Sequence, residues 1–94
     1  DELTEAIKSL KTKLNDEQID GSIKFEIEGV GSIVITNGSV KESSEDADCT
    51  LIGSLETFKE IFSGELNSTT AFMGGRLKVE GSMGIAMKYN SVLS

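Results

Sequence analysis

The sequence predicts a single α+β domain over residues 1–94, with a mostly antiparallel sheet. Apolar residues recur at helical spacing near both ends of the chain, and segments in which apolar and polar residues alternate gather in its middle. The pair Asn37-Gly38, a strong signal for a tight turn, joins two of these alternating segments. Strands grouped together along the chain, with helices to one side, are typical of this fold class.

The N-terminal segment predicts an amphipathic helix over residues 2–16. Its apolar residues recur at intervals of three and four, and its lysines lie elsewhere on the helix surface. The apolar stripe consists of Leu3, Ile7, Leu10 and Leu14.

Strands are predicted next. The segment SIKFEIEG (22–29) alternates apolar and charged residues, as half-buried strands do. After the turn Gly29-Val30-Gly31 comes a second strand, SIVITNG (32–38), and the Asn37-Gly38 turn leads into a short third strand, SVKES (39–43).

The segment after the third strand predicts a loop, because ESSEDAD (42–48) is polar and acidic. CTLIG (49–53) predicts a further strand. Cys49 is expected to point inward from it as a small apolar packing residue, in preference to acting as a nucleophile.

Ser54 is predicted to begin a short helix, because a serine hydroxyl can accept the free backbone N–H groups of the first turn. Gly64 is expected to follow its last turn, as glycine commonly does. The apolar side of this helix consists of Leu55, Phe58, Ile61 and Phe62.

Asn67 predicts the start of another short helix, which continues to Met73 and stops at Gly74-Gly75. The segment RLKVEG (76–81) alternates and predicts the last strand. Ser82 is expected to cap a final helix that extends to about Leu93.

The final helix is unusual because it has two apolar faces. A surface helix needs one apolar stripe, so a second indicates burial on both sides or a side that faces a ligand or a partner. Gly84 in its first turn costs ~1 kcal/mol relative to alanine, which suggests a close approach or a hinge. The two faces consist of Met83, Ala86 and Met87 and of Ile85, Tyr89 and Val92.

The composition of the chain argues against several classes of function and location. A net charge of −7 argues against nucleic acid and against docking on anionic membranes, since both reward clustered basic residues. No stretch approaches the ~20 apolar residues that span a bilayer. The first residues lack the pattern of a secretion signal, and a single cysteine fits a reducing compartment, so we expect a cytoplasmic protein.

Catalysis has few candidate groups. The chain contains no histidine, so it offers no Ser-His or Cys-His pair and no zinc site of nitrogen and sulfur ligands. Four acidic residues in 42–48 lack the pattern of a calcium loop, and a solvated loop is the favoured interpretation. We therefore expect neither enzyme activity, nor a cofactor, nor a bound metal. The soft, methionine-rich C-terminal third fits either a pocket for a long apolar ligand or an ordinary core.

Four stretches of the second half match a known family in order: ADCT (47–50), SGELN (63–67), AFMGGRLKVEG (71–81) and MGIAMK (83–88). With them, residues 47–88 closely resemble the sterol carrier protein type 2 family. The resemblance implies a five-stranded sheet covered on one face by helices, with an apolar tunnel between them. It also implies noncatalytic binding and transfer of fatty acids, acyl-CoA esters, phospholipids or sterols.

The resemblance further implies which residues line or gate the tunnel: Phe72, Met73, Leu77, Met83 and Met87. Periodicity together with the family fold adds Phe25, Ile27, Ile33, Ile35, Ile61 and Phe62. Arg76 and Lys88 are candidate partners for a lipid carboxylate or phosphate at the tunnel mouth.

Some features depart from the animal members of the family. The turn at 29–31 is tighter, and the chain ends in NSVLS, where those members carry a Ser-Lys-Leu-like peroxisomal signal. The short form resembles stand-alone bacterial domains, which favours fatty acyl chains or phospholipids over sterols. The alternative is a protein-interaction or regulatory module that has lost its tunnel and packs its last helix against a partner or a second copy; a monomer is otherwise expected.

Overall fold

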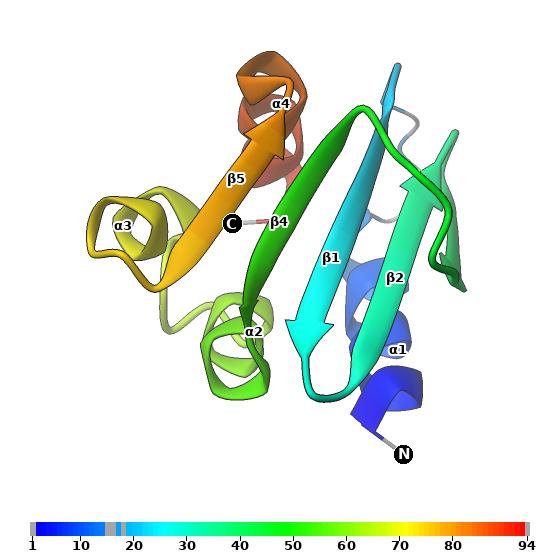
Figure 1. Ribbon diagram of the computed structural model, residues 1–94. Coiled ribbons are helices and arrows are strands. Elements are labelled where there is room, and N and C mark those ends of the chain that lie inside the picture. The colour runs from blue at the N-terminus through cyan, green and yellow to red at the C-terminus, as the bar shows by residue number, and fades with distance from the viewer. Residues whose placement is uncertain (1, 15–16, 18, 94) are drawn as a thin grey trace.

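The computed structural model describes residues 2–14, 17 and 19–93, and in this part of the chain a five-stranded sheet packs against helices (Figure 1). The elements follow the predicted order. They are α1 (Glu2–Leu14), β1 (Ser22–Glu28), β2 (Gly31–Thr36), β3 (Ser39–Glu42), β4 (Cys49–Ser54), α2 (Leu55–Phe62), α3 (Ser68–Met73), β5 (Leu77–Gly81) and α4 (Met83–Leu93).

The strands lie in the order β3-β2-β1-β4-β5. Neighbouring strands are antiparallel except β1 and β4, which are parallel, so the predicted mostly antiparallel α+β fold is confirmed. The central strand fixes the register on both sides, because Phe25 lies opposite Ile33 of β2 and Leu51 of β4. The edge strand β5 pairs with β4 alone among the described strands.

The predicted turn between β2 and β3 is confirmed. Asn37 has φ 51° and Gly38 has φ 82°, the two positive values that a tight hairpin turn matching the twist of its strands requires. The turn sets the pairing of Thr36 with Ser39 and of Ile35 with Val40.

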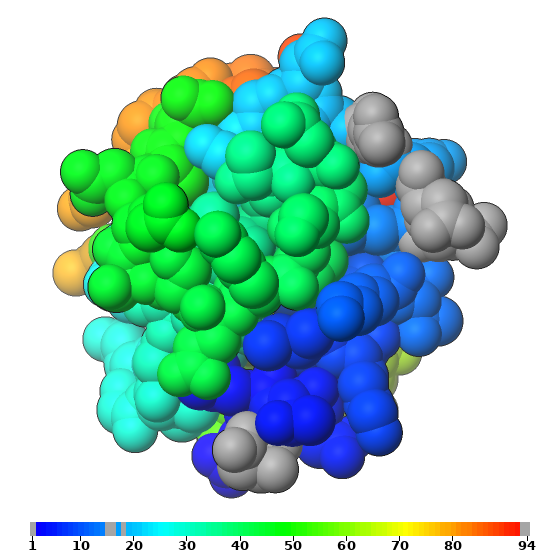
Figure 2. All heavy atoms as spheres, turned by 90° about the vertical axis from the view of Figure 1, so that its right-hand side faces the viewer, coloured from blue at the N-terminus to red at the C-terminus, as the bar shows by residue number. Residues whose placement is uncertain are grey.

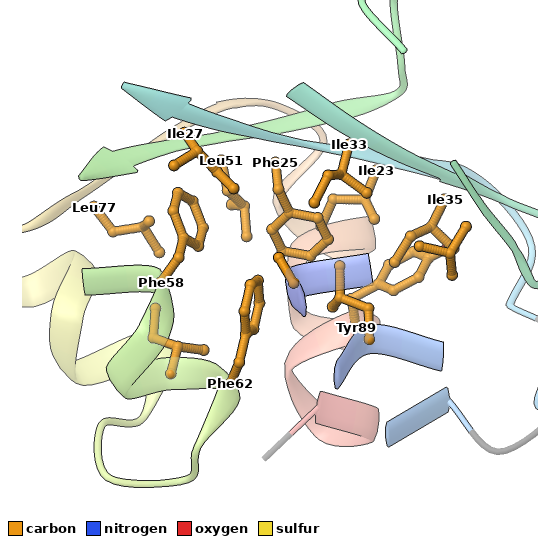
Figure 3. Close-up of a cluster of buried hydrophobic side chains, with 14 of the residues drawn as sticks. Ile23, Phe25, Ile27, Ile33, Ile35, Leu51, Phe58, Phe62, Leu77 and Tyr89 are labelled. Atoms are coloured by element: carbon orange, nitrogen blue, oxygen red, sulfur yellow. The ribbon is translucent and has the colours of Figure 1, made fainter. Parts of the chain in front are cut away.

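The four helices α1 to α4 cover one face of the sheet, and the alternation in the strands decides which face (Figures 1 and 3). In β1 the inward residues Ile23, Phe25 and Ile27 are at most 2% exposed. Figure 2 views the molecule from the β3 edge, where α1 (blue) packs beside the green residues of β3 and the segment after it.

The opposite face of the sheet is partly covered by the acidic segment after β3. The Ser43 backbone N–H donates to the Ser32 carbonyl oxygen at 3.1 Å, and the Lys24 ammonium donates to the Ser44 carbonyl oxygen at 3.2 Å. Val34, which points to this face from β2, is buried.

Helix α1 ends at Leu14, and the last two residues of the predicted range, 15 and 16, lie outside the described residues. The predicted stripe is buried except at Ile7, which is half-buried and packs against the core. Ala6, one position earlier, is buried as well.

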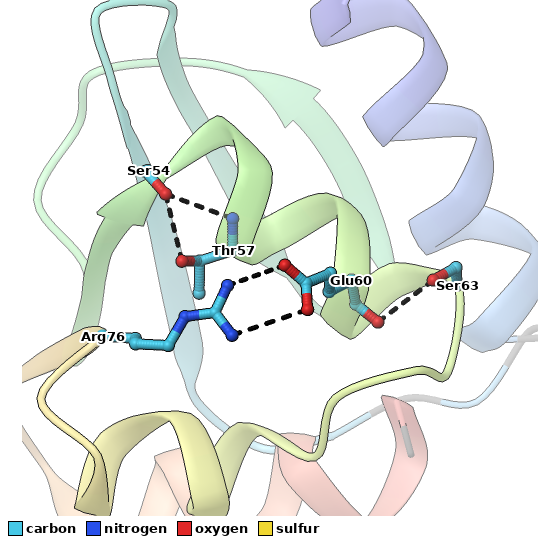
Figure 4. Close-up of polar contacts among 5 residues, drawn as sticks. All are labelled: Ser54, Thr57, Glu60, Ser63 and Arg76. Carbon is cyan, nitrogen blue, oxygen red and sulfur yellow. Dashed lines mark hydrogen bonds and ion pairs between the residues drawn. The ribbon is translucent and has the colours of Figure 1, made fainter.

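The predicted helix starts are also confirmed. Ser54 Oγ accepts the Thr57 backbone N–H at 3.1 Å and so begins α2 directly after β4 (Figure 4). The side chains of Asn67 and Ser82 accept backbone N–H groups of α3 and α4 in the same way.

Three phenyl rings fill the space between the sheet and α2 (Figure 3). Phe25 meets Phe58 and Phe62 edge to face at 5.8 Å, and the two α2 rings stack at 5.7 Å. Cys49 is fully buried beside this core, and burial raises the pKa of its thiol. The interpretation of Cys49 as an inward packing residue is therefore confirmed.

Candidate ligand-binding groove

An apolar groove, hereafter the α3–α4 groove, lies between α3, β5 and α4. Its volume is about 280 Å³, close to the lower limit of ~300 Å³ for small-molecule pockets. Its apolar lining consists of Leu51, Phe72, Met73, Leu77, Val79, Met83, Ala86 and Met87.

The first wall of the groove is α3, which β5 holds through a short turn. The Arg76 backbone N–H donates to the Ala71 carbonyl oxygen at 2.9 Å. Ala71 is fully buried, so the next two residues of this short helix, Phe72 and Met73, are turned toward solvent and the groove. Leu77 and Val79 on β5 add to the lining below them.

The opposite wall is α4, and its two apolar faces are confirmed. Tyr89 is 1% exposed and lies in the core, where its hydroxyl donates to the Gly21 carbonyl oxygen at 3.1 Å. Burial, together with the Asp48 carboxylate, raises the pKa of the Tyr89 hydroxyl. Met83 and Met87 lie on the other face and line the groove.

The side chains of the groove are unusually exposed for their size. Among the described residues, the large apolar side chains that are exposed are Phe72 at 42%, Met73 at 80%, Met83 at 47% and Met87 at 68%. All of them line the α3–α4 groove. Contiguous exposed apolar surface on a small domain marks a site of interaction, because single scattered apolar residues are the ordinary case.

Polar groups gather where the start of α3 meets the second half of α4. The Ser68 hydroxyl donates to Asn90 Oδ1, and Thr69 lies beside them in the lining. Each described residue that lines the groove is uncharged. The groove can therefore withdraw apolar surface from water and form neutral hydrogen bonds, and its lining offers no acid, base or nucleophilic thiol.

Five of the predicted tunnel residues, Phe72, Met73, Leu77, Met83 and Met87, meet in this groove. The other predicted residues do not line it. Those on the strands and in α2 lie in the packed core between the sheet and the helices, and they are Phe25, Ile27, Ile33, Ile35, Ile61 and Phe62. A tunnel that passes through this core stays a prediction.

A second groove lies between α1 and α2, and Phe62 and Phe58 form part of its wall. Its volume is about 350 Å³, and its rim carries Glu2, Glu5 and Lys59. The stacked rings of Phe58 and Phe62 stand at this side of the core (Figure 3).

The two predicted head-group residues lie outside the lining of the α3–α4 groove. Arg76 forms a two-point ion pair with Glu60, hereafter the fork. Its Nη2 donates to Oε2 at 2.7 Å and its Nη1 donates to Oε1 at 3.5 Å (Figure 4). This fork lowers the pKa of the Glu60 carboxyl and raises that of the Arg76 guanidinium. Lys88 is exposed on α4, on the side that the helical period places away from Met83 and Met87.

Six lining residues were not predicted as site residues: Leu51, Ser68, Thr69, Val79, Ala86 and Asn90. Asn90 could have been found, because it follows Met87 by three and Met83 by seven on the same helix face. Ser68 and Thr69 gave no signal beyond their place in the first turn of α3.

The acidic residues predicted as a solvated loop make individual contacts. Asp48 accepts the Ser22 backbone N–H at 3.0 Å, and Glu45 pairs with Lys41 at 3.0 Å, which lowers the pKa of the Glu45 carboxyl. In the described residues, no three or more His, Cys, Asp or Glu side chains gather as metal ligands would. The helices described here are also too short or too polar to cross a bilayer.

The model of the SCP-2 sterol transfer family matches residues 2–94 of this chain. The chain belongs to this family. A relative, Hydroxysteroid dehydrogenase-like protein 2 of Xenopus tropicalis, is 30% identical over 102 residues, covering 97% of this chain and 24% of the relative. The chain spans about a quarter or less of the length of the first curated relatives it matches.

Solved structures of the family share the fold. The sterol carrier protein domain 2 of Helicoverpa armigera is 30% identical, with a TM-score of 0.78 over 98% of this chain and 85% of that one. Sterol Carrier Protein-2 of Aedes aegypti, solved as a complex with the C16 fatty acid palmitate, is 20% identical with a TM-score of 0.79, over 99% of this chain and 94% of that one. At that identity the second likeness shows the fold alone.

Proposed function

We propose that this SCP2 domain binds a long apolar ligand in the α3–α4 groove and carries it without changing it chemically. The candidate ligands are fatty acids, acyl-CoA esters, phospholipids and sterols. The observation that carries the proposal is the gathering of Phe72, Met73, Met83 and Met87, all exposed, on one groove. The palmitate bound by the Aedes aegypti relative supports an acyl chain as the occupant.

The energetics favour an extended chain over a compact ligand. Each methylene withdrawn from water contributes ~0.8 kcal/mol, so several methylenes along a shallow groove give useful affinity. Methionine side chains are flexible and polarizable, and three of them can adapt to ligands of different shape. The uncharged lining supplies no group for acid-base or nucleophilic chemistry, which supports a carrier.

The test is native mass spectrometry of the purified protein, followed by organic extraction and identification of what is released. We expect a substoichiometric series of acyl-containing lipids. An apo mass, with no uptake when oleate, palmitoyl-CoA or the neutral 1-decanol is added, would refute the proposal. It would leave the exposed face of α4 to a protein partner or a second copy.

A further inference from the structure

We infer that the α3–α4 groove selects lipids with a neutral, hydrogen-bonding head group, such as an alcohol or an ester, over lipids with a free carboxylate or phosphate, and that Ser68 and Asn90 make this selection. The inference rests on the proposed function and specifies its ligand class.

The first argument is the absence of charge in the described lining. A carboxylate that leaves water needs a cation or several hydrogen-bond donors in return. The described residues lining the groove supply no cation. Arg76 already forms a fork with Glu60, and Lys88 lies on the side of α4 away from the methionines. The net charge of −7 also opposes an anion.

The second argument is the polar pair itself. Ser68 and Asn90 are both half-buried, and they reach each other across the groove from residues 22 apart. Because Asn90 Oδ1 accepts the Ser68 hydroxyl, the Asn90 amide retains two N–H donors and the Ser68 oxygen retains lone pairs. One neutral donor and one neutral acceptor side by side match a ligand hydroxyl, and the amide alone matches an ester carbonyl.

The third argument is position. Ser68 and Asn90 lie at the start of α3 and in the second half of α4, whereas Met73 ends α3 and Met83 begins α4. A lipid whose oxygen lies between Ser68 and Asn90 can therefore place its chain along the apolar remainder of the lining. A site built to hydrogen-bond a ligand group discriminates more strongly than an apolar pocket does.

The experiment compares 1-decanol with decanoate at pH 7.5, two ligands of equal chain length, by titration of the ¹⁵N-labelled protein. We expect 1-decanol to bind about 10-fold more tightly or better, with shifts at Ser68 and Asn90. In a Ser68→Ala, Asn90→Leu double variant we expect the ratio to fall below about 3. Ser91→Ala, on the exposed face of α4, is the matched control and should keep the wild-type ratio.

The possible outcomes distinguish a failure of the head-group selection from a failure of the proposed lipid binding. Equal binding of both ligands, or tighter binding of decanoate, overturns the selection and leaves the proposed function intact. A preference for 1-decanol that disappears in 0.5 M NaCl also overturns it, since long-range repulsion by the net charge would then be the cause. If neither ligand shifts the resonances of the groove, the proposed function fails as well. An amide spectrum of each variant confirms that it is folded.

Discussion

The Tyr89 hydroxyl donates a hydrogen bond to the Gly21 carbonyl oxygen at 3.1 Å, and so joins residues 68 apart in the sequence. It fixes the core face of α4 at the start of β1, while the opposite face of the same helix stays open as the wall of the groove. One helix thereby serves the core and the site at once.

Removing this hydrogen bond should destabilise the domain measurably. Tyr89→Phe keeps the ring and leaves the carbonyl of the half-buried Gly21 without this partner, so we expect the free energy of unfolding to fall by about 1–2 kcal/mol. Chemical denaturation followed by circular dichroism measures this. Because the Tyr89 pKa is raised in the folded state, wild-type stability should also fall as the pH rises past ~10, where the unfolded tyrosine ionises first. The phenylalanine variant should lack this part of the decline.

Gly81, the last residue of β5, should tolerate no side chain. Its φ is +88°, and a Cβ would overlap the carbonyl oxygen of Asp48. Gly64 has nearly the same φ, +86°, with open space around it, so Gly64→Ala is a matched control for the backbone strain alone. We expect Gly64→Ala to cost about 1–2 kcal/mol and Gly81→Ala to cost more than 4 kcal/mol, measured by thermal and chemical unfolding. Equal losses would show that the Asp48 carbonyl moves aside freely.

Local signals predicted most of this fold. The turn residues Asn37 and Gly38 and the cap residues Ser54 and Asn67 act on backbone groups within a few positions, so their effect can be recognised in the sequence. The family resemblance added that five strands form one sheet covered on one face by helices, but it did not include the strand order or the parallel pairing of β1 with β4.

The candidate site was predicted only in part, because it depends on contacts between distant residues. The pairing of Arg76 with Glu60 spans 16 positions, and that of Ser68 with Asn90 spans 22. Periodicity shows that Phe25 and Met87 are apolar and face one side of their elements. It does not show that phenyl rings of α2 close over Phe25 while Met87 remains exposed.

The fork between Glu60 and Arg76 should be visible in the titration of Glu60. Its pKa is lowered chiefly by the hydrogen bonds from Arg76, so Arg76→Gln should raise it toward the ordinary value for a glutamate. A carboxyl with a lowered folded pKa adds stability above the unfolded pKa and loses it as the pH falls through the folded one. Wild-type stability should therefore decline more steeply with acid than that of the variant. The ¹³C shift of the Glu60 carboxyl measures the pKa, and Lys41→Gln, which breaks the ion pair between Lys41 and Glu45, should leave it unchanged.

Replacing Gly84 with alanine should stabilise the domain. The sequence suggested a close approach or a hinge there, but a Cβ would meet only Ser82 Oγ at an ordinary 3.7 Å, so the close approach is not found. Because alanine has the better helix propensity, Gly84→Ala should raise the free energy of unfolding by about 0.5–1 kcal/mol. Unchanged or reduced stability would indicate that α4 needs the freedom of glycine at this position.

The exposed methionines should matter for ligand binding and little for folding. Met73 and Met87 are 80% and 68% exposed, so a Met73→Gln, Met87→Gln variant should keep the free energy of unfolding within about 0.5 kcal/mol of wild type. The same change places amides where an acyl chain would lie, and burying an amide without a partner costs about 1–3 kcal/mol. We therefore expect the affinity for 1-decanol to fall about 10-fold, measured by titration. The matched Met73→Leu, Met87→Leu variant keeps the groove apolar and should bind nearly as well as wild type. If the glutamine variant bound equally tightly, the methionines would lie outside the ligand path, and the groove between α1 and α2 would become the candidate path.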